Sequence, residues 1–283
     1  MLGLLRRHRE TIGLWLLAVI FAAACVLLGR WQLHRYQDKH GRAALVARNY
    51  DATPVELAAL LPPAATSLDP GDQWRPVRAR GTYDVTGTVL VRNRPRTGGG
   101  ADAVYGYEVV VPLVLDDGSA LLVDRGWLPN GSLGSTPGQA PDAVPAPATG
   151  RVEVVARLKA PEPERSADLP RGQVGSVAVG RIGALSGLRV APAYAVLVSE
   201  TPSAATTPLP LDRPVVDGGE GINASYAVQW VVFALLGLGF PVWVGRRRRA
   251  ALAEDAAAGA PSPAAAPQPA RVRRPRIWDA DGE

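Results

Sequence analysis

The stretch "NASYAVQW", Asn223 to Trp230, lies near the start of the longest uncharged run of the chain, residues 222–245. This run holds 24 residues, and a second run of 19 uncharged residues, Thr11–Gly29, lies near the amino terminus. At about 1.5 Å of rise per residue, a helix over either run reaches across a hydrocarbon core of roughly 30 Å. The sequence therefore predicts two transmembrane helices, over residues 11–29 and 222–245.

The first run has two other interpretations, because three basic residues of the preceding segment, Arg6, Arg7 and Arg9, resemble the start of a signal peptide. The small residues at 22–24 offer a cleavage site, and a lipoprotein signal would end at Cys25. Cys25 is the single cysteine of the chain, so no disulfide framework can form within it.

Charge is unevenly distributed along the chain. Between Arg30 and Gly221, 20 basic and 20 acidic residues cancel, whereas the two tails together hold 11 basic and 6 acidic residues. Arg246–Arg249 directly follow the second run, and basic residues favour the cytoplasmic side. We therefore expect a cell-membrane protein with two spans, both termini cytoplasmic and an extracytoplasmic central domain. The neutral charge of that domain argues against nucleic acid as a partner, and the two spans would contact membrane lipid.

The segment between the spans divides into two parts. Residues 30–72 are predicted to be a helical extension of the first span, uninterrupted until Gly41, and then a linker. Residues 73–216 alternate strand and turn signals, such as the hairpin turn Asp116-Asp-Gly-Ser119. They predict a mainly antiparallel β domain of α+β class, built as a small barrel or sandwich. The expected strands are 74–83, 88–94, 107–115, 120–127, 151–159, 173–179 and 194–198, with a short helix at 181–187.

Composition marks the less regular segments. Residues 1–10 form the amino-terminal cytoplasmic tail, and the Gly- and Pro-rich residues 96–102 and 128–150 are expected to be loops. Residues 246–283 begin with four arginines, continue Ala- and Pro-rich and end in a basic cluster. We expect this segment to be a disordered cytoplasmic tail.

The histidine count excludes most catalytic sites. The three histidines of the chain are His8, His34 and His40. Residues 73–216 hold neither histidine nor cysteine, so the usual zinc ligands and a Ser-His-Asp triad are unavailable there. A Ser–Lys hydrolase would need Lys159 beside Ser166 or Ser176, and nothing marks either serine as a nucleophile. We therefore predict no catalytic residue, no metal site and no enzymatic activity.

Two charged stretches of the β domain have alternative interpretations. Arg92, Arg94 and Arg96 recur at every second residue, so they could clamp a carboxylate or form a solvated strand face. Asp124-Arg125-Gly126-Trp127 predicts an internal ion pair beside a buried tryptophan, which is a structural role.

Two short motifs stand at the ends of the central segment. Gly29-Arg-Trp-Gln-Leu-His-Arg35, with Lys39 after it, resembles the W-Q-x-x-R motif that closes the first span of the surfeit locus protein 1 family. Tyr226-Ala-Val-Gln-Trp230 resembles the Y-A-x-x-W motif that opens its last span.

Three motifs of the β domain lie between them in the family's order. Gly81-Thr-Tyr-Asp84 is similar to G-T-F/Y-D, Tyr105–Leu113 to an aromatic-x-V-x-x-P strand, and Val123–Pro129 to V-N-R-G-W-V-P. Together the five motifs cover roughly residues 12 to 245.

The resemblance implies an assembly factor for haem-copper cytochrome c oxidase, which helps haem a to reach the catalytic subunit. Such a protein is a chaperone or carrier rather than an enzyme. Its expected partners are the catalytic subunit and the haem a synthesis machinery, and haem a would be bound transiently. The alternative is a membrane-anchored extracytoplasmic binding or scaffold protein without a haem role.

One position departs from the family pattern. In relatives that bind haem a, a histidine lies three residues before the Tyr of Y-A-x-x-W, and here Asn223 occupies that place. An amide is a poor axial ligand for haem iron, whereas imidazole is a common one. Tyr226 and Trp230 remain candidate neighbours of haem a, although an aromatic belt at the membrane surface also explains them.

His34 is the imidazole best placed to replace the missing one. In a two-span hairpin the outer end of the first helix lies level with the outer start of the second, so we expect that His34 and Asn223 can face each other. Arg35 could neutralise a haem propionate. His40 is the second choice, and the alternative is that His34 is a histidine at the headgroup level bonded to water or lipid.

Overall fold

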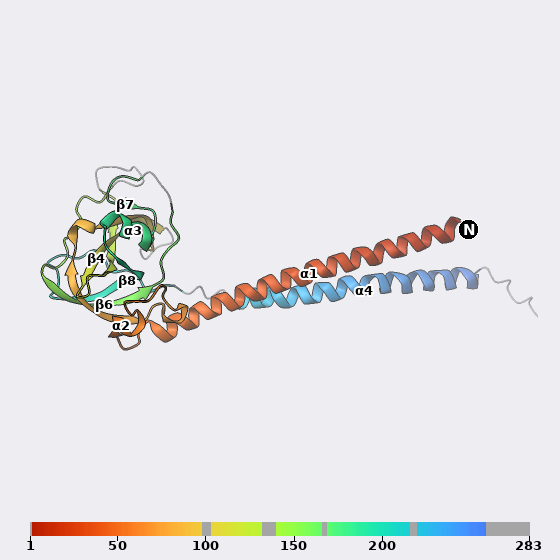
Figure 1. Ribbon diagram of the computed structural model, residues 1–283. Helices are drawn as coiled ribbons and strands as arrows, with labels where there is room; N and C mark the ends of the chain where they lie inside the picture. Colours follow the sequence, from red (N-terminus) through yellow and green to blue (C-terminus); the bar gives the residue numbers. More distant parts are fainter. Residues whose placement is uncertain (1, 98–102, 132–139, 166–168, 216–219, 259–283) are drawn as a thin grey trace, which may run out of the picture. The chain divides into compact units, whose positions relative to one another are not determined.

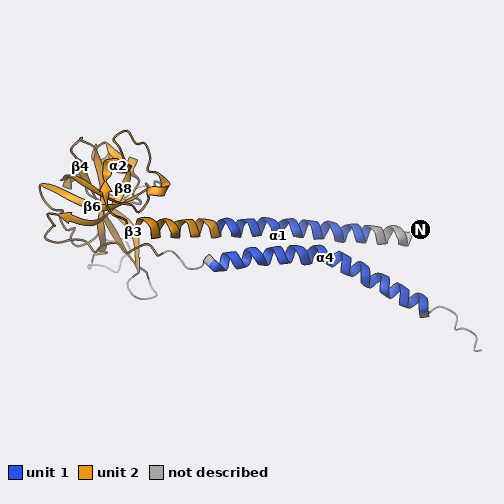
Figure 2. Ribbon diagram, turned by 90° about the horizontal axis from the view of Figure 1, so that it is seen from below, with its two compact units in different colours: residues 1–35, 221–283 blue, residues 36–220 orange. Residues whose placement is uncertain are grey.

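The computed structural model describes residues 2–97, 103–131, 140–165, 169–215 and 220–258. The chain forms two compact units, one of residues 1–35 with 221–283 and one of residues 36–220 (Figure 2). We call the first the helix pair and the second the barrel unit. Figure 1 marks their elements along the chain.

The helix pair is built from α4 (Glu220–Ala258) and the first part of α1 (Leu2–Asn49). Both helices are long and apolar enough to cross a membrane, with mean hydropathies of 2.6 and 1.9 over their most apolar windows. The two helices contain the two predicted spans. Whether the first span is retained or cleaved as a signal stays a prediction.

Both helices are longer than expected. α1 passes through Gly41 and ends at Asn49, because one glycine costs a helix only about 1 kcal/mol. α4 continues past the four arginines to Ala258, so the tail predicted to be disordered is helical up to that residue. Alanine, leucine, arginine and glutamate, which fill this extension, are strong helix formers. The remainder of the tail lies outside the described residues.

Small residues bring α1 and α4 together in antiparallel directions. Ala22 and Cys25 of α1 form a buried cluster with Ala234 of α4. A Cβ placed on Gly29 would lie 3.4 Å from the Trp230 Cβ, and Arg248 pairs with Glu10 at 3.8 Å near the opposite end. Residue numbers therefore fall along α1 as they rise along α4. Such small residues allow the close backbone approach on which helix packing in membranes depends.

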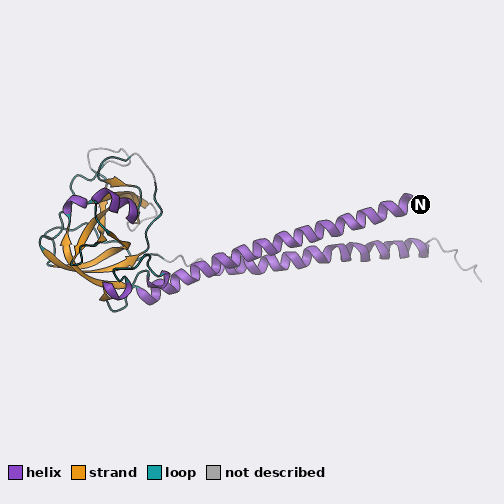
Figure 3. Cartoon of the chain, viewed as in Figure 1, coloured by secondary structure: helices purple, strands orange, loops and turns teal. Residues whose placement is uncertain are grey.

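The barrel unit begins with the end of α1 and contains all the described strands (Figure 3). In chain order its further elements are β1 (Val55–Glu56), α2 (Leu57–Leu60), the 3₁₀ helix η1 (Pro70–Asp72), β2 (Pro76–Tyr83), the 3₁₀ helix η2 (Val85–Gly87), β3 (Val89–Thr97), β4 (Ala103–Leu115), β5 (Ala120–Pro129), β6 (Arg151–Lys159), β7 (Gln173–Val174), α3 (Val179–Ser186) and β8 (Val190–Thr201).

The predicted strands are confirmed apart from one. Residues 173–179 were expected to form a full strand, but β7 has only two residues, because it pairs with β3 at Leu90 and Val91 alone. The predicted short helix is α3, which begins at Val179, ends at Ser186 and is capped by Gly187, a glycine with φ 70°. Parts of both predicted loops, residues 98–102 and 132–139, lie outside the described residues.

The sheet closes on itself as a barrel. The strands are hydrogen-bonded in the order β2, β6, β8, β5 and β4, and β4 pairs with β2 again at Gly81–Tyr83. β1 adds to β2, while β3 and β7 extend outward from β4. Of the eight pairings between described strands, five are antiparallel and three, β1–β2, β3–β7 and β5–β8, are parallel. The sheet is thus mixed, and the mainly antiparallel arrangement is only partly right.

Two apolar cores lie on opposite faces of β5. Leu121 and Val123 belong to the larger core, which includes the inward residues of β2, β4 and β6. Leu122 belongs to the smaller core, which includes Ile182 of α3 and Tyr194 of β8. Every residue of β5 up to Leu128 is buried, because successive side chains enter alternate cores. Any charged residue on this strand must therefore be accommodated inside the protein.

Gly106 of β4 tests how tightly the barrel is packed. A Cβ at this position would clash with the Leu128 carbonyl and with the indole ring of Trp127. We expect Gly106→Ala to lower the free energy of unfolding by about 1–3 kcal/mol, because an overpacked site must shift its neighbours. Urea unfolding of the detergent-solubilised chain measures this loss.

Gly180→Ala is the matched control, because nothing lies within 4 Å of the added methyl group on α3. It should be neutral or stabilise the chain by up to about 1 kcal/mol. Equal stability of both variants would show that Gly106 is not a packing constraint.

Candidate functional site

Tyr226 and Trp230 differ in their surroundings within the helix pair. Trp230 is partly covered by α1 at Gly29, and its ring meets Phe233 edge-on at a centroid distance of 5.8 Å. Tyr226 is 47% exposed. Trp230 therefore has a packing role, whereas the ring of Tyr226 remains available to a partner or to lipid.

His34 and Asn223 lie level with each other but on different sides of the helix pair. Gly29 contacts α4 at Ala227 and Trp230. His34 follows Gly29 by five residues, which is about 7.5 Å along α1. Asn223 precedes Ala227 by four residues, which is about 6 Å along α4 in the same direction, because the two helices are antiparallel. However, five residues also turn a helix by roughly 140° away from the contact face. His34 is accordingly exposed while Asn223 is partly buried, and that the two side chains face each other stays a prediction.

The other predicted residues of this region are held by aromatic rings. The Arg35 guanidinium lies 5.2 Å from the ring centroid of Trp31, one helical turn earlier. His40 belongs to the barrel unit and stacks on Tyr36 at 5.8 Å. His34, Arg35 and Trp31 thus form an exposed group on α1.

Arg94 is neither on a solvated strand face nor free to clamp an external carboxylate. Its Nε lies 2.8 Å from Glu108 Oε2, and a terminal nitrogen lies 2.6 Å from Glu162 Oε2. Its carbonyl accepts a hydrogen bond from the indole nitrogen of Trp127 at 2.9 Å. Of its predicted companions, Arg96 lies over the Trp127 ring and bonds the Pro210 carbonyl, while Arg92 is partly buried.

One further carboxyl group, that of Asp124, makes this cluster an internal charge network. Asp124 is 1% exposed and accepts a hydrogen bond from the Gly126 amide at 3.1 Å. Burial, and then the charge of Glu108, raise the pKa of Asp124 well above its usual value. Burial also raises the pKa of Glu108 despite the opposing charge of Arg94. The pKa values of Asp124 and Glu108 thus both lie above their usual range, whereas Arg94 lowers the pKa of Glu162 against the effect of burial.

Arg125 enters the larger core and joins a different network. Its guanidinium lies 3.5 Å from Glu200 Oε1, and it donates to the Pro145 carbonyl at 2.9 Å. The Tyr83 hydroxyl donates to Glu200 Oε2 at 3.0 Å. Burial first, and then the charge of Glu200, raise the pKa of Tyr83. The predicted ion pair between Asp124 and Arg125 is therefore wrong, because neighbours on a strand point to opposite faces. The predicted burial of Trp127 is confirmed.

The groups required for a Ser–Lys hydrolase do not meet at Ser176. Its hydroxyl donates to the Pro163 carbonyl and accepts from the Arg165 amide. Lys159 lies 5.0 Å from the ring centroids of Trp74 and Tyr194. Ser166 lies outside the described residues.

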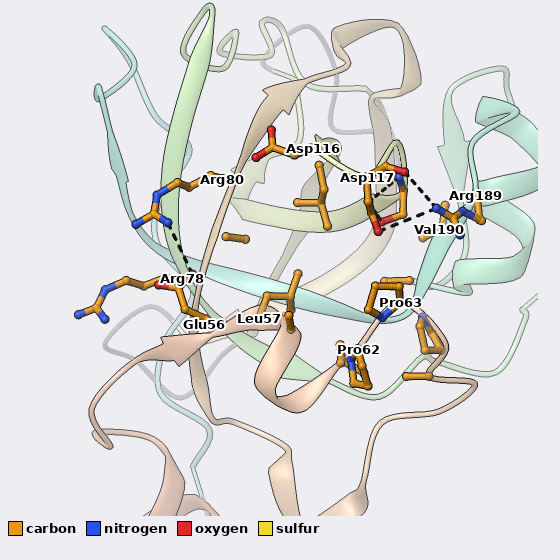
Figure 4. A pocket seen from close by; sticks show the side chains of 18 of the residues that line it. Glu56, Leu57, Pro62, Pro63, Arg78, Arg80, Asp116, Asp117, Arg189 and Val190 are labelled. Carbon is orange, nitrogen blue, oxygen red and sulfur yellow. Dashed lines mark hydrogen bonds and ion pairs between the residues drawn. The ribbon is translucent and has the colours of Figure 1, made fainter.

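Sequence reasoning missed a cavity of about 550 Å³ between α2, β2 and the start of β8 (Figure 4). Its apolar lining comes from α2, the prolines after it, β2 and the start of β8, and includes Leu57, Leu61, Pro62, Pro63, Ala79 and Pro192. Its charged lining consists of Arg78, Arg80, Arg151 and Arg189 with Glu56, Asp116 and Asp117. No local signal marks it, because its walls come from segments far apart in the sequence.

Comparison with known proteins agrees with the motif order. The sequence model of the SURF1 family matches residues 19–235, which contain the barrel unit and most of both apolar runs. The chain belongs to the SURF1 family. The resemblance to the surfeit locus protein 1 motifs is thereby confirmed.

Relatives within the SURF1 family extend over nearly the same length. Proteins named "uncharacterized SURF1-like protein" occur in Mycobacterium bovis strain AF2122/97 and in Mycobacterium tuberculosis strains CDC 1551 and H37Rv. Each is 32% identical over 247 residues, which cover 84% of this chain and 85% of the relative. The SURF1 family is known generally as a family of cytochrome oxidase assembly factors.

The raised pKa of Asp124 gives the stability of this SURF1 protein a defined dependence on pH. A carboxyl whose pKa is raised on folding stabilises the fold below its unfolded pKa of about 4, and this stabilisation is lost as pH rises through the folded value. Asp124→Asn keeps an acceptor for the Gly126 amide and carries no charge. We therefore expect its free energy of unfolding, relative to the unmodified chain, to increase from pH 5 to pH 8.

Urea unfolding at the two pH values measures this difference. Asp116→Asn is the control, because Asp116 is exposed and its hydrogen bond from Arg151 lowers its pKa. That variant should show no gain at pH 8. A difference in unfolding free energy between Asp124→Asn and the unmodified chain that does not change with pH would contradict the raised pKa of Asp124.

Proposed function

We propose that this protein is an assembly factor for haem a-containing cytochrome c oxidase, and that it assists the delivery or insertion of haem a into the catalytic subunit. The observation that carries the proposal is the family match over residues 19–235. Carboxylates of the barrel unit also support a non-enzymatic role. Glu108 and Glu162 are bound to Arg94, and Glu200 is bound to Arg125, so these side chains are not aligned in a cleft.

The proposed location is the cell membrane, with two spans, both termini in the cytoplasm and the barrel unit outside. The apolar lengths of α1 and α4 support two spans, and Arg246–Arg249 support the orientation. Cysteines introduced at Gly118 and Ala256 report it: an impermeant thiol reagent should modify only the first from outside. Modification of Ala256→Cys alone would reverse the orientation.

The helix pair does not fit a haem site between its helices. Asn223 offers an amide, and the imidazole of His34 at the same level is turned away from the contact face. The group that does fit is on the exposed side of α1, where His34 offers a ligand and Arg35 a cation for a propionate. Tyr226 and Trp230 are proposed as neighbours contributed by α4. Contact with haem a would thus be lateral and transient, suited to transfer to the oxidase subunit.

Deletion of the gene tests the assembly role. We expect lower haem a absorbance in reduced-minus-oxidised spectra of membranes and lower oxidase turnover, with growth and haem a synthesis retained. Re-expression of the intact chain should restore both. Normal absorbance and turnover in the deleted cells would leave the alternative, a membrane-anchored binding or scaffold protein without a haem role.

His34→Ala tests the proposed haem neighbours. After co-expression with haem a synthesis, we expect the purified variant to retain less haem a than the unmodified chain, and Asn223→His to retain more. His8→Ala is the control, because His8 lies near the opposite end of α1. Retention that is unchanged in His34→Ala would remove His34 from the site.

A further inference from the structure

The barrel cavity has the size and rigidity of a ligand site. Its 550 Å³ lie within the roughly 300–1,000 Å³ of small-molecule sites in proteins. Leu57, Leu61 and Ala79 of its lining are buried members of the larger core, so they hold the floor in place. Pro62 and Pro63 restrict the backbone of one wall. An apolar floor of this kind favours an apolar molecule over a hydrated one.

Three of the four arginines that line the cavity are bound by carboxylates. Arg80 lies 2.8 Å from Glu153, which does not line the cavity, and 3.7 Å from Glu56. Arg151 holds Asp116 through two bonds of 2.6 Å, and Arg189 lies 3.9 Å from Asp117. Arg80, Arg151 and Arg189 are thus all engaged in ion pairs.

Arg78 is the fourth arginine and forms no ion pair with any described residue. Its one hydrogen bond goes to the Pro54 carbonyl at 3.2 Å. A guanidinium has five N–H donors, so most of them remain for another acceptor. Arg78 is partly buried, and an anion next to it would gain more than at a fully exposed arginine.

The backbone around the cavity does not favour a peptide strand. β2 is paired with β6 along its length, with β1 at Val77 and Arg78, and with β4 from Gly81 onward. On the side of β2 away from β6, the described strands leave only Pro76, Ala79 and Arg80 unpaired. A peptide added as a strand needs a longer free edge.

We propose that this cavity binds a single-chain molecule with an apolar tail and a terminal carboxylate, such as a long-chain fatty acid. The tail lies over the floor formed by Leu57, Leu61 and Ala79, and the carboxylate binds Arg78. The proposal does not depend on oxidase assembly or on haem a.

Photocrosslinking of the full chain in nanodiscs tests whether the barrel cavity binds a fatty acid. The probe is palmitate with a diazirine in its tail, and adducts are mapped by mass spectrometry. We expect adducts on residues 57–63 and 190–192, in addition to adducts on α1 and α4 that arise from the bilayer. Excess palmitate should remove the barrel adducts, and hexadecanol should compete about tenfold less well, as expected for the loss of one charge-assisted hydrogen bond.

Two variants of α2 provide a matched pair. Ala58 and Ala59 are both exposed, but only Ala58 lines the cavity. Ala58→Trp should fill the cavity and abolish the barrel adducts, while the helix adducts persist as an internal reference. Ala59→Trp should retain both sets.

Arg78→Gln tests the carboxylate without changing the floor. It should abolish the preference for palmitate over hexadecanol, whereas Arg181→Gln, an exposed arginine on α3, should preserve it. The proposal is overturned by the absence of barrel adducts in the unmodified chain, by their survival in Ala58→Trp, or by equal competition from the alcohol. It is also overturned if vesicles of anionic phospholipid displace the probe and palmitate does not.

Discussion

The burial of β5 on both faces is the constraint on which the barrel unit depends. Leu121, Leu122 and Val123 satisfy it with apolar side chains that enter the two cores in turn. Asp124 and Arg125 continue the same alternation, so each core receives one charge. A buried charge must be paired, and removing its partner typically costs about 3–5 kcal/mol. The networks around Arg94 and around Glu200 are the consequence of this placement.

The SURF1 motifs of the barrel unit meet at these contacts. Tyr83 of the first barrel motif and Arg125 of the last both bind Glu200. Gly106, in the strand of the middle motif, leaves room for the ring of Trp127. These residues therefore specify the fold, and their presence does not by itself identify a ligand site. The cavity next to α2 lies apart from them and is lined by other residues.

The fold could be predicted as far as local patterns determine it. Length and lack of charge reveal α1 and α4, and alternation reveals β6 at its observed bounds. The charge partners could not be predicted, because Tyr83 and Glu200 are 117 residues apart and meet only after the barrel closes. The closing contact is itself short, from Gly81 to Tyr83, and has no sequence signal beyond the glycine. The geometry of the candidate site could not be predicted either, since a motif gives the position of His34 along α1 but not its direction relative to α4.

The register of the helix pair limits how the missing histidine can be replaced. Gln32 follows Cys25 by seven residues and so lies on nearly the same face of α1, the face that contacts α4. Its Oε1 is buried and has no hydrogen-bond partner among the described residues. At this end of the contact face, α1 therefore carries the amide of Gln32 and α4 the amide of Asn223. A haem site between the helices would require an imidazole there. Because a helix rotates by about 100° per residue, a histidine two positions after Gln32 cannot occupy that face. The haem contact proposed above is therefore placed on the exposed side of α1, where His34 and Arg35 lie.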